Sequence, residues 1–551
     1  MKVLVAALLL VVACGGPGGP ADDGDDAGGD GGGDGGGDGN PCPGCVCQPG
    51  TGTCRGDIST ACRDDGSGFD EVFCDPVQGM TCGAAGVCEG ACAPATLGRS
   101  YIGCDYWPTV TGNMVSNLYE FAVAISNTGG APGMVTIEGG ALAQPLTFTV
   151  WPGSVEVRKL PWVAALKLCT ANNSITCGAN HTRSVRADGG AYHLRTTVPV
   201  TLYQFNPLDY TLPGVDENSF SNDASLLFPA SAWGDEHYVA TYRETVQRRP
   251  TLLAVTAAHD ATAVTVTTRA DTPAEGGAPA FTAGQPQVVM LDRGDVLQLG
   301  SEAMGADLTG SHVRADKPVQ VIGAHFCADV PTDVPYCDHL EESMFPVSTL
   351  STRYIVNAAA VPVRPGGREQ VVRIIATQPN TTIAYDPPQP GAPATIAAAG
   401  DFVELARQAA SYQISANQKV MVAQLMEGRL ALTKGVDGDP DLALAVPVEQ
   451  YRDNYLFHAP INYTHNYVDV TAPVGVDVIL DGFPLSSFTT WTPIGTSGFA
   501  VARTELSAGM AGDGNHFIHA QQPFGIMVYG YGIDTSYSYP GGLDQKIIPI
   551  Q

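Results

Sequence analysis

The chain has little positive charge. Its 551 residues include 28 Lys and Arg against 56 Asp and Glu, which gives a formal net charge of −28 at pH 7. Nucleic-acid binding needs basic side chains that neutralise phosphates, so this balance argues against a nucleic-acid partner.

Recognised catalytic motifs are also missing. The sequence has no G-x-S-x-G nucleophile elbow, no H-E-x-x-H motif and no G-x-x-x-x-G-K-[ST] phosphate loop. We therefore expect no catalytic residues and a non-enzymatic protein. A glycan-processing hydrolase is one alternative, and it would need two carboxylates that face each other across a cleft at roughly 5 to 10 Å.

The N-terminus has the features of an export signal. Lys2 precedes an apolar run, Val3 to Val12, that is too short to span a bilayer. The run leads into V-V-A-C, which resembles the bacterial lipobox, so we expect residues 1–14 to be a lipoprotein signal with Cys14 lipidated. Gly15 follows this cysteine and favours the outer membrane or cell surface. The alternative is an ordinary secretory signal with a chance cysteine.

Two segments precede the main body of the chain. Residues 15–40 are mostly Gly and Asp, which predicts a disordered tether. Nine of the 15 cysteines then lie between Cys42 and Cys92. This density with little apolar content predicts a disulfide-rich module over residues 41–104, with zinc at Cys42 and Cys45 as the alternative. Because nine is odd, one cysteine should pair outward, and we expect Cys92 to pair with Cys104.

Two later cysteine pairs are close in sequence. We expect Cys169 to pair with Cys177 and Cys327 with Cys337, because an exported protein meets an oxidising compartment. For the second pair the alternative is a zinc site completed by His325 and His339. If the disulfide forms, these histidines should be flanking surface groups.

The rest of the chain repeats a pattern. The stretch V-R-A-D-K-P-V-Q-V-I-G-A-H-F from Val313 resembles stretches that begin at Leu194, Ile414 and Ile518. It suggests a hairpin, with Pro199, Pro318, Lys419 and Pro523 in equivalent positions about 100 to 120 residues apart. An acidic or polar loop follows three of these stretches, and a tyrosine such as Tyr238 opens the next strand.

Alternating apolar residues broken by Gly, Pro, Asn and Asp predict an all-β fold without long helices. We expect repeated modules of about 100 residues, sandwich-like or propeller-like, over residues 105–545. The approximate units are 105–228, 229–345, 346–446 and 447–545.

The acidic loops are candidate calcium sites, since clustered carboxylates can bind calcium in extracellular modules. The candidate ligands are Asp338, Glu341, Glu342, Asp437, Asp439 and Asp441. The alternative is a solvated polar loop, and no other cofactor is expected. Tyrosine-rich strand ends offer candidate contacts for a ligand, with core packing as the alternative. They comprise Tyr203, Phe205, Tyr210, Tyr529, Tyr531, Tyr537 and Tyr539.

Several stretches in order resemble the N-terminal domain of the IgGFc-binding protein family. They are G-C-D-Y-W-P-T from Gly103, V-P-V-T-L-Y-Q-F-N-P-L-D-Y from Val198, S-N-D-A-S-L-L-F-P from Ser221, V-I-G-A-H-F-C-A-D-V-P from Val321 and Y-C-D-H-L-E-E-S-M-F-P from Tyr336. The resemblance implies an extracellular, non-enzymatic domain. We expect a lipid-anchored protein that binds an extracellular protein or glycan, or alternatively a structural envelope component.

Overall fold

The computed structural model describes residues 45–169, 181–215, 218–246, 248–361, 364–429, 438–461, 463–506 and 514–549. Residues 1–44, with Cys14 and the expected tether, lie outside these ranges, as do Cys177 and Asp437. The described chain is nearly all β, as the alternating apolar pattern predicts. Within it, no helix is long and apolar enough to cross a membrane.

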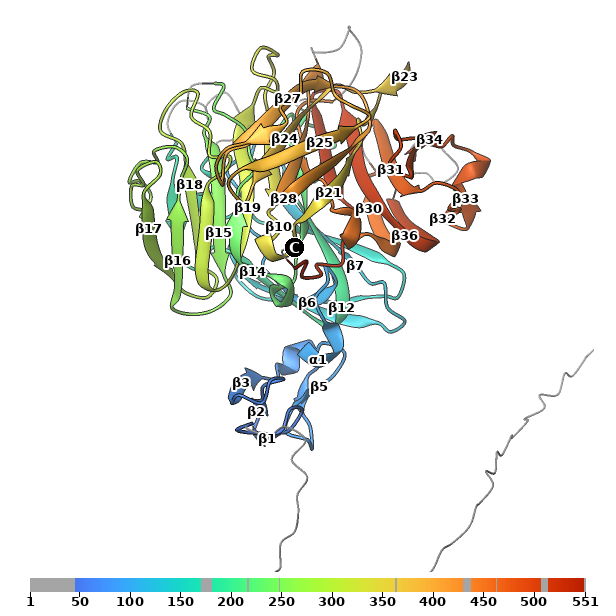
Figure 1. Ribbon diagram of the computed structural model, residues 1–551. Coiled ribbons are helices and arrows are strands. Elements are labelled where there is room, and N and C mark those ends of the chain that lie inside the picture. Colours follow the sequence, from blue (N-terminus) through green and yellow to red (C-terminus); the bar gives the residue numbers. More distant parts are fainter. Residues whose placement is uncertain are drawn as a thin grey trace, which may run out of the picture.

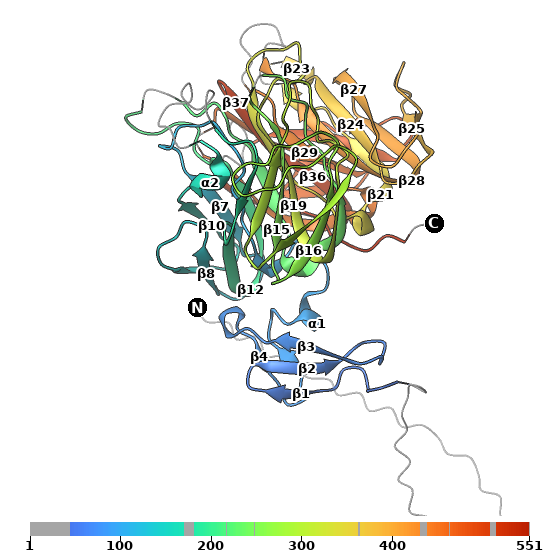
Figure 2. The same ribbon diagram turned by 90° about the vertical axis from the view of Figure 1, so that its left-hand side faces the viewer.

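A small cysteine-rich module comes first in the chain and lies below the main body (Figures 1 and 2). Its elements are β1 (Gly52–Arg55), β2 (Ile58–Cys62), β3 (Phe69–Phe73), β4 (Thr81–Cys82), β5 (Cys88–Glu89) and α1 (Pro94–Leu97). Four disulfides join Cys47 to Cys62, Cys54 to Cys82, Cys74 to Cys88 and Cys92 to Cys104. Cys45 is also disulfide-bonded. We call residues 45–104 the small module.

The main body contains four large antiparallel sheets, which we call the first to fourth sheets in chain order. The first is ordered β10-β7-β12-β8-β9, with β6 and β13 also paired to β12. Its strands are β6 (Gly103–Tyr106), β7 (Phe121–Ser126), β8 (Gly133–Gly139), β9 (Leu146–Val150), β10 (Val155–Leu160), β12 (Tyr192–Phe205) and β13 (Ala224–Leu227). The short α2 (Ala164–Lys167) follows β10.

The second sheet is ordered β11-β18-β15-β19-β16-β17, with β14 and β20 also paired to β19. Its strands are β11 (Val185–Ala187), β14 (Gly234–Tyr238), β15 (Thr251–Ala257), β16 (Thr262–Thr267), β17 (Pro286–Leu291), β18 (Val296–Gly300), β19 (His312–Ala328) and β20 (Asp338–Ser343). β11 precedes β12 in sequence yet pairs with β18, so the first unit contributes one strand to the second sheet.

The third sheet is ordered β26-β25-β28-β24-β27, with β21 and β29 also paired to β28. Its strands are β21 (Ser351–Val356), β24 (Gln370–Ala376), β25 (Thr381–Asp386), β26 (Thr395–Ile396), β27 (Phe402–Gln408), β28 (Tyr412–Met426) and β29 (Leu442–Leu444). A separate hairpin joins β22 (Ala360–Val361) to β23 (Arg364–Gly367).

The fourth sheet is ordered β33-β32-β36-β31-β35-β34, with β30 and β37 also paired to β36. Its strands are β30 (Arg452–Ala459), β31 (His465–Pro473), β32 (Val478–Leu480), β33 (Phe483–Pro484), β34 (Thr492–Pro493), β35 (Phe499–Glu505), β36 (Gly514–Gly532) and β37 (Thr535–Pro540).

The repeated stretch is one long strand in each sheet, so the hairpin expected from the sequence is wrong. In β19, Val319 lies opposite Gly234 and Arg314 opposite Glu236, which places residues 315–318 against Asp235 alone. This bulge bends the strand where the sequence suggested a turn. The part before the bulge pairs with β16 and the part after it with β15, so the sheet curls around the strand. β12, β28 and β36 have the same register shift.

At three of the four bulges, a buried tyrosine hydroxyl donates a hydrogen bond across the bulge. Tyr106, Tyr354 and Tyr455 donate hydrogen bonds to the backbone carbonyls of Val200, Val420 and Phe524, respectively. In the second sheet the equivalent position is His237, three residues after Gly234, and not the neighbouring Tyr238 expected from the sequence. The repeated tyrosine therefore stabilises the bend in three units only.

The strand that follows each long strand lies at the centre of the body. We call β13, β20, β29 and β37 the central strands. β13 packs against β20 and β37, and β29 packs against the same two strands, so the four close a ring. Figure 1 shows the four sheets grouped around this centre. One hydrophobic cluster includes residues of all four sheets, so the units share one core and are not separately packed domains.

Candidate functional site

The acidic segments lie in or beside the central strands. The whole of β20 is buried, including Asp338, Glu341 and Glu342, and Asp439 and Asp441 just before β29 are also buried. These residues form neither an exposed calcium loop nor a solvated polar loop, because all of them are buried inside the ring. Among the described residues, no group of three or more His, Cys, Asp and Glu side chains is placed to hold a metal ion.

Asp223, directly before β13, is hydrogen-bonded to residues of all four units. Its carboxylate accepts hydrogen bonds from its neighbour Ala224 at 2.8 Å, from Glu341 at 2.9 Å, from Leu442 at 3.1 Å and from Ser538 at 3.4 Å, in each case from the backbone N–H. Desolvation by burial raises the pKa of Asp223 well above its usual range, and Asp441 adds to this effect. The sequence analysis quoted this segment but did not single out the residue.

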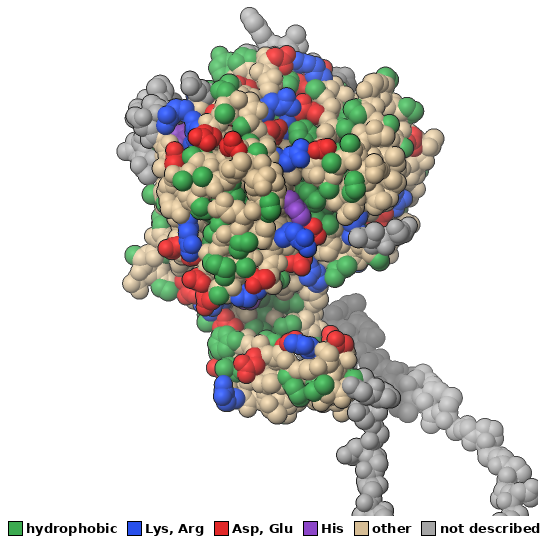
Figure 3. Space-filling view, turned by 60° about the vertical axis from the view of Figure 1, so that its left-hand side comes forward, with side chains coloured by type: hydrophobic (Ala, Val, Ile, Leu, Met, Phe, Trp, Pro, Cys, Tyr) green, Lys and Arg blue, Asp and Glu red, His purple; other side chains and the backbone are tan. Residues whose placement is uncertain are grey.

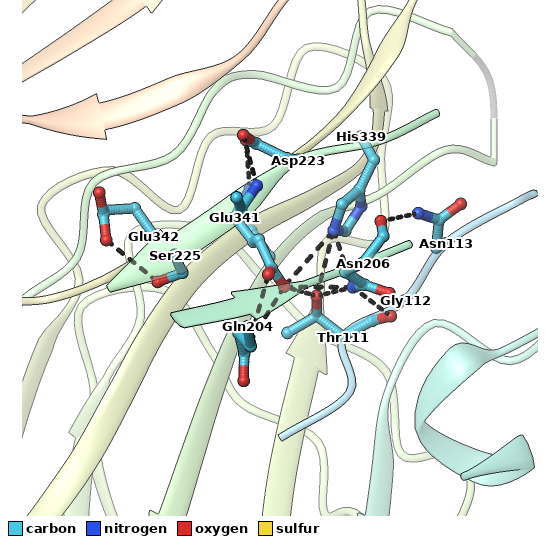
Figure 4. A network of polar contacts seen from close by, with 12 residues as sticks. Thr111, Gly112, Asn113, Gln204, Asn206, Asp223, Ser225, His339, Glu341 and Glu342 are labelled. Carbon is cyan, nitrogen blue, oxygen red and sulfur yellow. Dashed lines mark hydrogen bonds and ion pairs between the residues drawn. The ribbon is translucent and has the colours of Figure 1, made fainter. Parts of the chain in front are cut away.

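Glu341 anchors a second buried network, shown in Figure 4. Its carboxylate accepts hydrogen bonds from Thr111 Oγ1 at 2.8 Å, from Gln204 Nε2 at 3.2 Å and from Asn206 Nδ2 at 3.1 Å. His339 Nε2 lies 3.0 Å from Asn206 Nδ2 in the same network. The network joins polar side chains of the first two units, although Asn206 Oδ1 and His339 Nδ1 have no hydrogen-bond partner within the described part of the chain.

Asp338 and Glu342 are also bonded inside the ring. Asp338 accepts a hydrogen bond from Thr535 Oγ1 at 2.8 Å, and Glu342 accepts one from Ser225 Oγ at 3.0 Å. Burial raises the pKa of both carboxyl groups well above the usual range. Buried carboxyl groups with raised pKa values hold their protons to higher pH.

The structure contains the disulfide between Cys327 and Cys337, so these sulfurs do not ligate zinc. His325 and His339 are completely buried, so their expected placement at the surface is wrong. Burial lowers the pKa of His325 to about 3. Cys169 is also disulfide-bonded, while its expected partner Cys177 lies outside the described residues.

The tyrosine-rich strand ends are buried as well, and each of the seven aromatic residues is at most 4% exposed. They pack on one another near the centre, for example Tyr203 against Tyr539 at a ring separation of 4.5 Å. Core packing, and not ligand contact, is therefore their role.

A cavity of about 650 Å³ opens where the loops between long and central strands meet. We call it the axial cavity. Its lining residues come from all four units and comprise Met114, Phe220, Val246, Arg249, Cys327, Asp329, Pro335, Tyr336, Cys337, Arg429, Asp439 and Asp534. Ligand pockets usually have volumes of about 300 to 1,000 Å³, so this cavity can hold a small ligand or a loop of a partner.

Charged residues of both signs line the axial cavity. Arg429 forms an ion pair with Asp534, and its backbone N–H donates to Asp439 Oδ1 at 3.1 Å. Desolvation by burial raises the pKa of Asp439 to about 7. Arg429 thus holds Asp534 through its guanidinium and Asp439 through its backbone N–H, whereas a hydrolase needs two carboxylates free on opposite sides of a cleft.

A second cavity, between the third and fourth units, has a volume of only about 60 Å³. Asp441 and Asp469 line it, together with Asn357, Gln424 and Tyr529. Its size and polar lining suit a few water molecules but not a sugar or a side chain of a partner.

Sequence reasoning found the disulfide and Asp439 at the axial cavity but missed Arg249, Tyr336 and Arg429. One signal for Tyr336 was available, because the residue lies inside the loop that Cys327 and Cys337 close. Arg249 lies in the same unit as this loop, 78 residues before Cys327, and Arg429 lies in the next unit, so only the fold brings the two arginines to the loop.

Comparison with known proteins points to a binding protein. The family model described as IgGFc binding protein matches residues 223–530. The human IgGFc-binding protein is 28% identical over 319 residues, which are 57% of this chain and 6% of the human protein. The chain therefore spans a small part of that relative's length. The disulfides and this similarity indicate an extracellular protein. Because the family model covers more than half of the sequence, this chain belongs to the IgGFc-binding protein family.

Proposed function

We propose that the protein is a non-enzymatic, lipid-anchored cell-surface protein that binds an extracellular protein or glycan through the axial cavity and its surrounding loops. The observation that supports this most is the cavity itself, which loops from all four units build at one end of the body. Loops on a rigid β scaffold are a common arrangement for recognition.

The position of the small module supports this orientation. Asp75 of the small module forms an ion pair with Arg195, and Gln78 donates a hydrogen bond to the backbone carbonyl of Cys104. Both contacts lie near the bulge of β12, while the strand beyond it leads to the cavity loops after Phe205. An N-terminal anchor at Cys14 would thus hold the cavity away from the membrane.

Antibody Fc is one candidate partner, and the name of the human relative motivates it. That relative is far longer than the matched segment, so Fc is tested beside other partners. The surface drawn in Figure 3 mixes charged and hydrophobic side chains, without one dominant patch that would name a partner.

A binding screen tests the proposal. The chain from Gly15 onward, with disulfides intact, is presented to antibody Fc, arrayed glycans and envelope extracts. We expect one saturable partner whose binding falls at least tenfold in the double variant Arg249→Gln, Tyr336→Ala and is unchanged in Arg158→Gln on β10. A saturable partner that the double variant binds normally would show that the axial cavity is not the site. A folded protein without any partner would favour a structural envelope role.

Lipidation is tested separately. An alkyne-labelled fatty acid fed to cells that express the full chain should label the protein, and Cys14→Ser should abolish the label. Labelling that survives this substitution would contradict the proposed anchor.

A further inference from the structure

We infer that the axial cavity binds a saccharide residue that carries a carboxylate, with Arg249 binding the carboxylate and Tyr336 packing against the sugar ring. This inference rests on the proposed function, since it names the class of ligand for the same cavity. It goes further because the names of the family and of its human member specify no sugar.

Among the described residues, Arg249 forms no direct ion pair with a carboxylate, although the charge of Asp329 on the same cavity acts on it from a greater distance. Its side-chain contacts within the described part of the chain are to the sulfurs of Cys327 and Cys337, which are weak acceptors. Arg429 on the same cavity differs, because it is paired with Asp534. Burial lowers the pKa of Arg249, and the charge of Asp329 opposes this effect.

The guanidinium of Arg249 has a planar set of donors that matches a carboxylate. A single unpaired arginine suits one carboxylate and not a polyanion, which the net charge of −28 would repel. A monosaccharide acid presents one such group beside several hydroxyls. The volume of about 650 Å³ is sufficient for one or two sugar rings.

Tyr336 is a strained and exposed aromatic residue at this cavity. Its φ is 78°, in the left-handed region that bulky residues rarely adopt, and its exposed fraction is 56%. The disulfide at its neighbour Cys337 holds the loop, and the Arg429 guanidinium lies 5.0 Å from the ring centroid. Strained conformations that the surroundings enforce concentrate at functional sites. An exposed tyrosine ring offers an apolar surface with a polar tip, as a sugar ring requires.

Carboxylates complete the lining as acceptors for sugar hydroxyls. Asp329 is half-buried, and its backbone N–H donates to Thr245 Oγ1 at 2.9 Å, which fixes the loop on the side of Arg249. Asp439 and Asp534 lie beside Arg429. The cavity thus combines an arginine without a direct ion pair among the described residues, one aromatic surface and several hydroxyl acceptors.

Saturation-transfer NMR and calorimetry with the chain from Gly15 onward, disulfides intact, test the inference. The probes are glucuronic acid and N-acetylneuraminic acid, compared with their methyl esters and with glucose. We expect at least one acid to bind at least tenfold more tightly than its methyl ester and than glucose. Arg249→Gln should abolish that preference, Tyr336→Ala should weaken binding of the acid at least fivefold, and Arg158→Gln should change neither.

Equal binding of acid and ester, no binding of either acid, or a preference that survives Arg249→Gln would each overturn the inference. If Arg249→Gln does not fold, the ester comparison on the unaltered protein still decides. A protein partner captured through the cavity in the screen above, with no acid bound, would overturn this inference alone and leave the proposed function intact.

Discussion

The small module and the β body are stabilised by different interactions. In the small module, Phe69 and Phe73 on β3 are 50% and 58% exposed, and its buried cluster consists largely of cysteines. In the body, one large cluster of aliphatic and aromatic side chains runs through all four sheets. A segment of about 60 residues buries too little apolar surface for independent stability, so covalent links replace a core there.

The body also has to accommodate buried carboxyl groups at its centre. Its ring of central strands buries several carboxyl groups, with Asp223 bonded to backbone groups of every unit. Such groups are tolerated only when hydrogen bonds satisfy them, so they impose one arrangement of the four sheets. The comparison teaches that the small module depends on oxidation, whereas the body depends on its apolar core and on hydrogen bonds to its buried carboxyl groups.

Reduction should separate the two regions most clearly. Dithiothreitol should unfold the small module, because loss of a native disulfide in a small domain costs about 2 to 5 kcal/mol. The body should stay folded, since its disulfide between Cys327 and Cys337 closes a short loop on an existing core. Limited proteolysis with mass spectrometry should find new cleavages before residue 105. Equal loss of protection in the sheets would refute the comparison.

Asp223→Ala should destabilise the body by about 4 kcal/mol, because it leaves the backbone N–H groups of three other units without their buried acceptor. Chemical unfolding followed by tryptophan fluorescence measures this change. Asp223→Asn keeps an acceptor oxygen and should cost less, while Asp235→Ala at an exposed position is the control. Similar midpoints for Asp223→Ala and the control would show that the junction is dispensable.

The contribution of Asp469 to the stability of the body should fall as pH rises from about 4 to about 6. Burial raises the pKa of Asp469 to about 6, so the folded state keeps a proton that the unfolded chain has released. The stabilisation that Asp469 contributes is therefore greatest below its unfolded pKa and is lost as pH rises through its folded pKa. The loss from this group is at most about 3 kcal/mol. As pH rises across this range, Asp469→Asn should lose less stability, or gain more, than the unaltered protein, and an identical pH dependence of the unfolding midpoints would exclude Asp469 as a source.

Tyr354→Phe should cost about 1 kcal/mol, because it removes the hydroxyl that donates to Val420 at 2.5 Å across the bulge of β28. Tyr238→Phe should leave the free energy of unfolding within about 0.5 kcal/mol, since His237 occupies the equivalent position in the second unit. Thermal unfolding of both variants provides the measurement. A larger loss for Tyr238→Phe than for Tyr354→Phe would reverse our assignment of the bulge residue.

Local patterns in the sequence predicted much of the fold. Alternation gave the β class, and the self-similar stretches near Pro199, Pro318, Lys419 and Pro523 located the long strands. The bulges were mistaken for turns, because a proline after polar residues looks alike in both until the neighbouring strand is known. Likewise, the acidic residues of β20 looked exposed because polarity alone does not reveal hydrogen-bond partners more than 100 residues away.

The sequence by itself determined the all-β class, the repeats and the pairing of Cys327 with Cys337, because each depends on residues close together in the chain. Only the tertiary structure decided that Asp223 joins four units and that Arg249, Tyr336 and Arg429 meet at one cavity. The physical reason is that closing a ring of sheets brings together residues from separate units, and no local periodicity records which of them will meet.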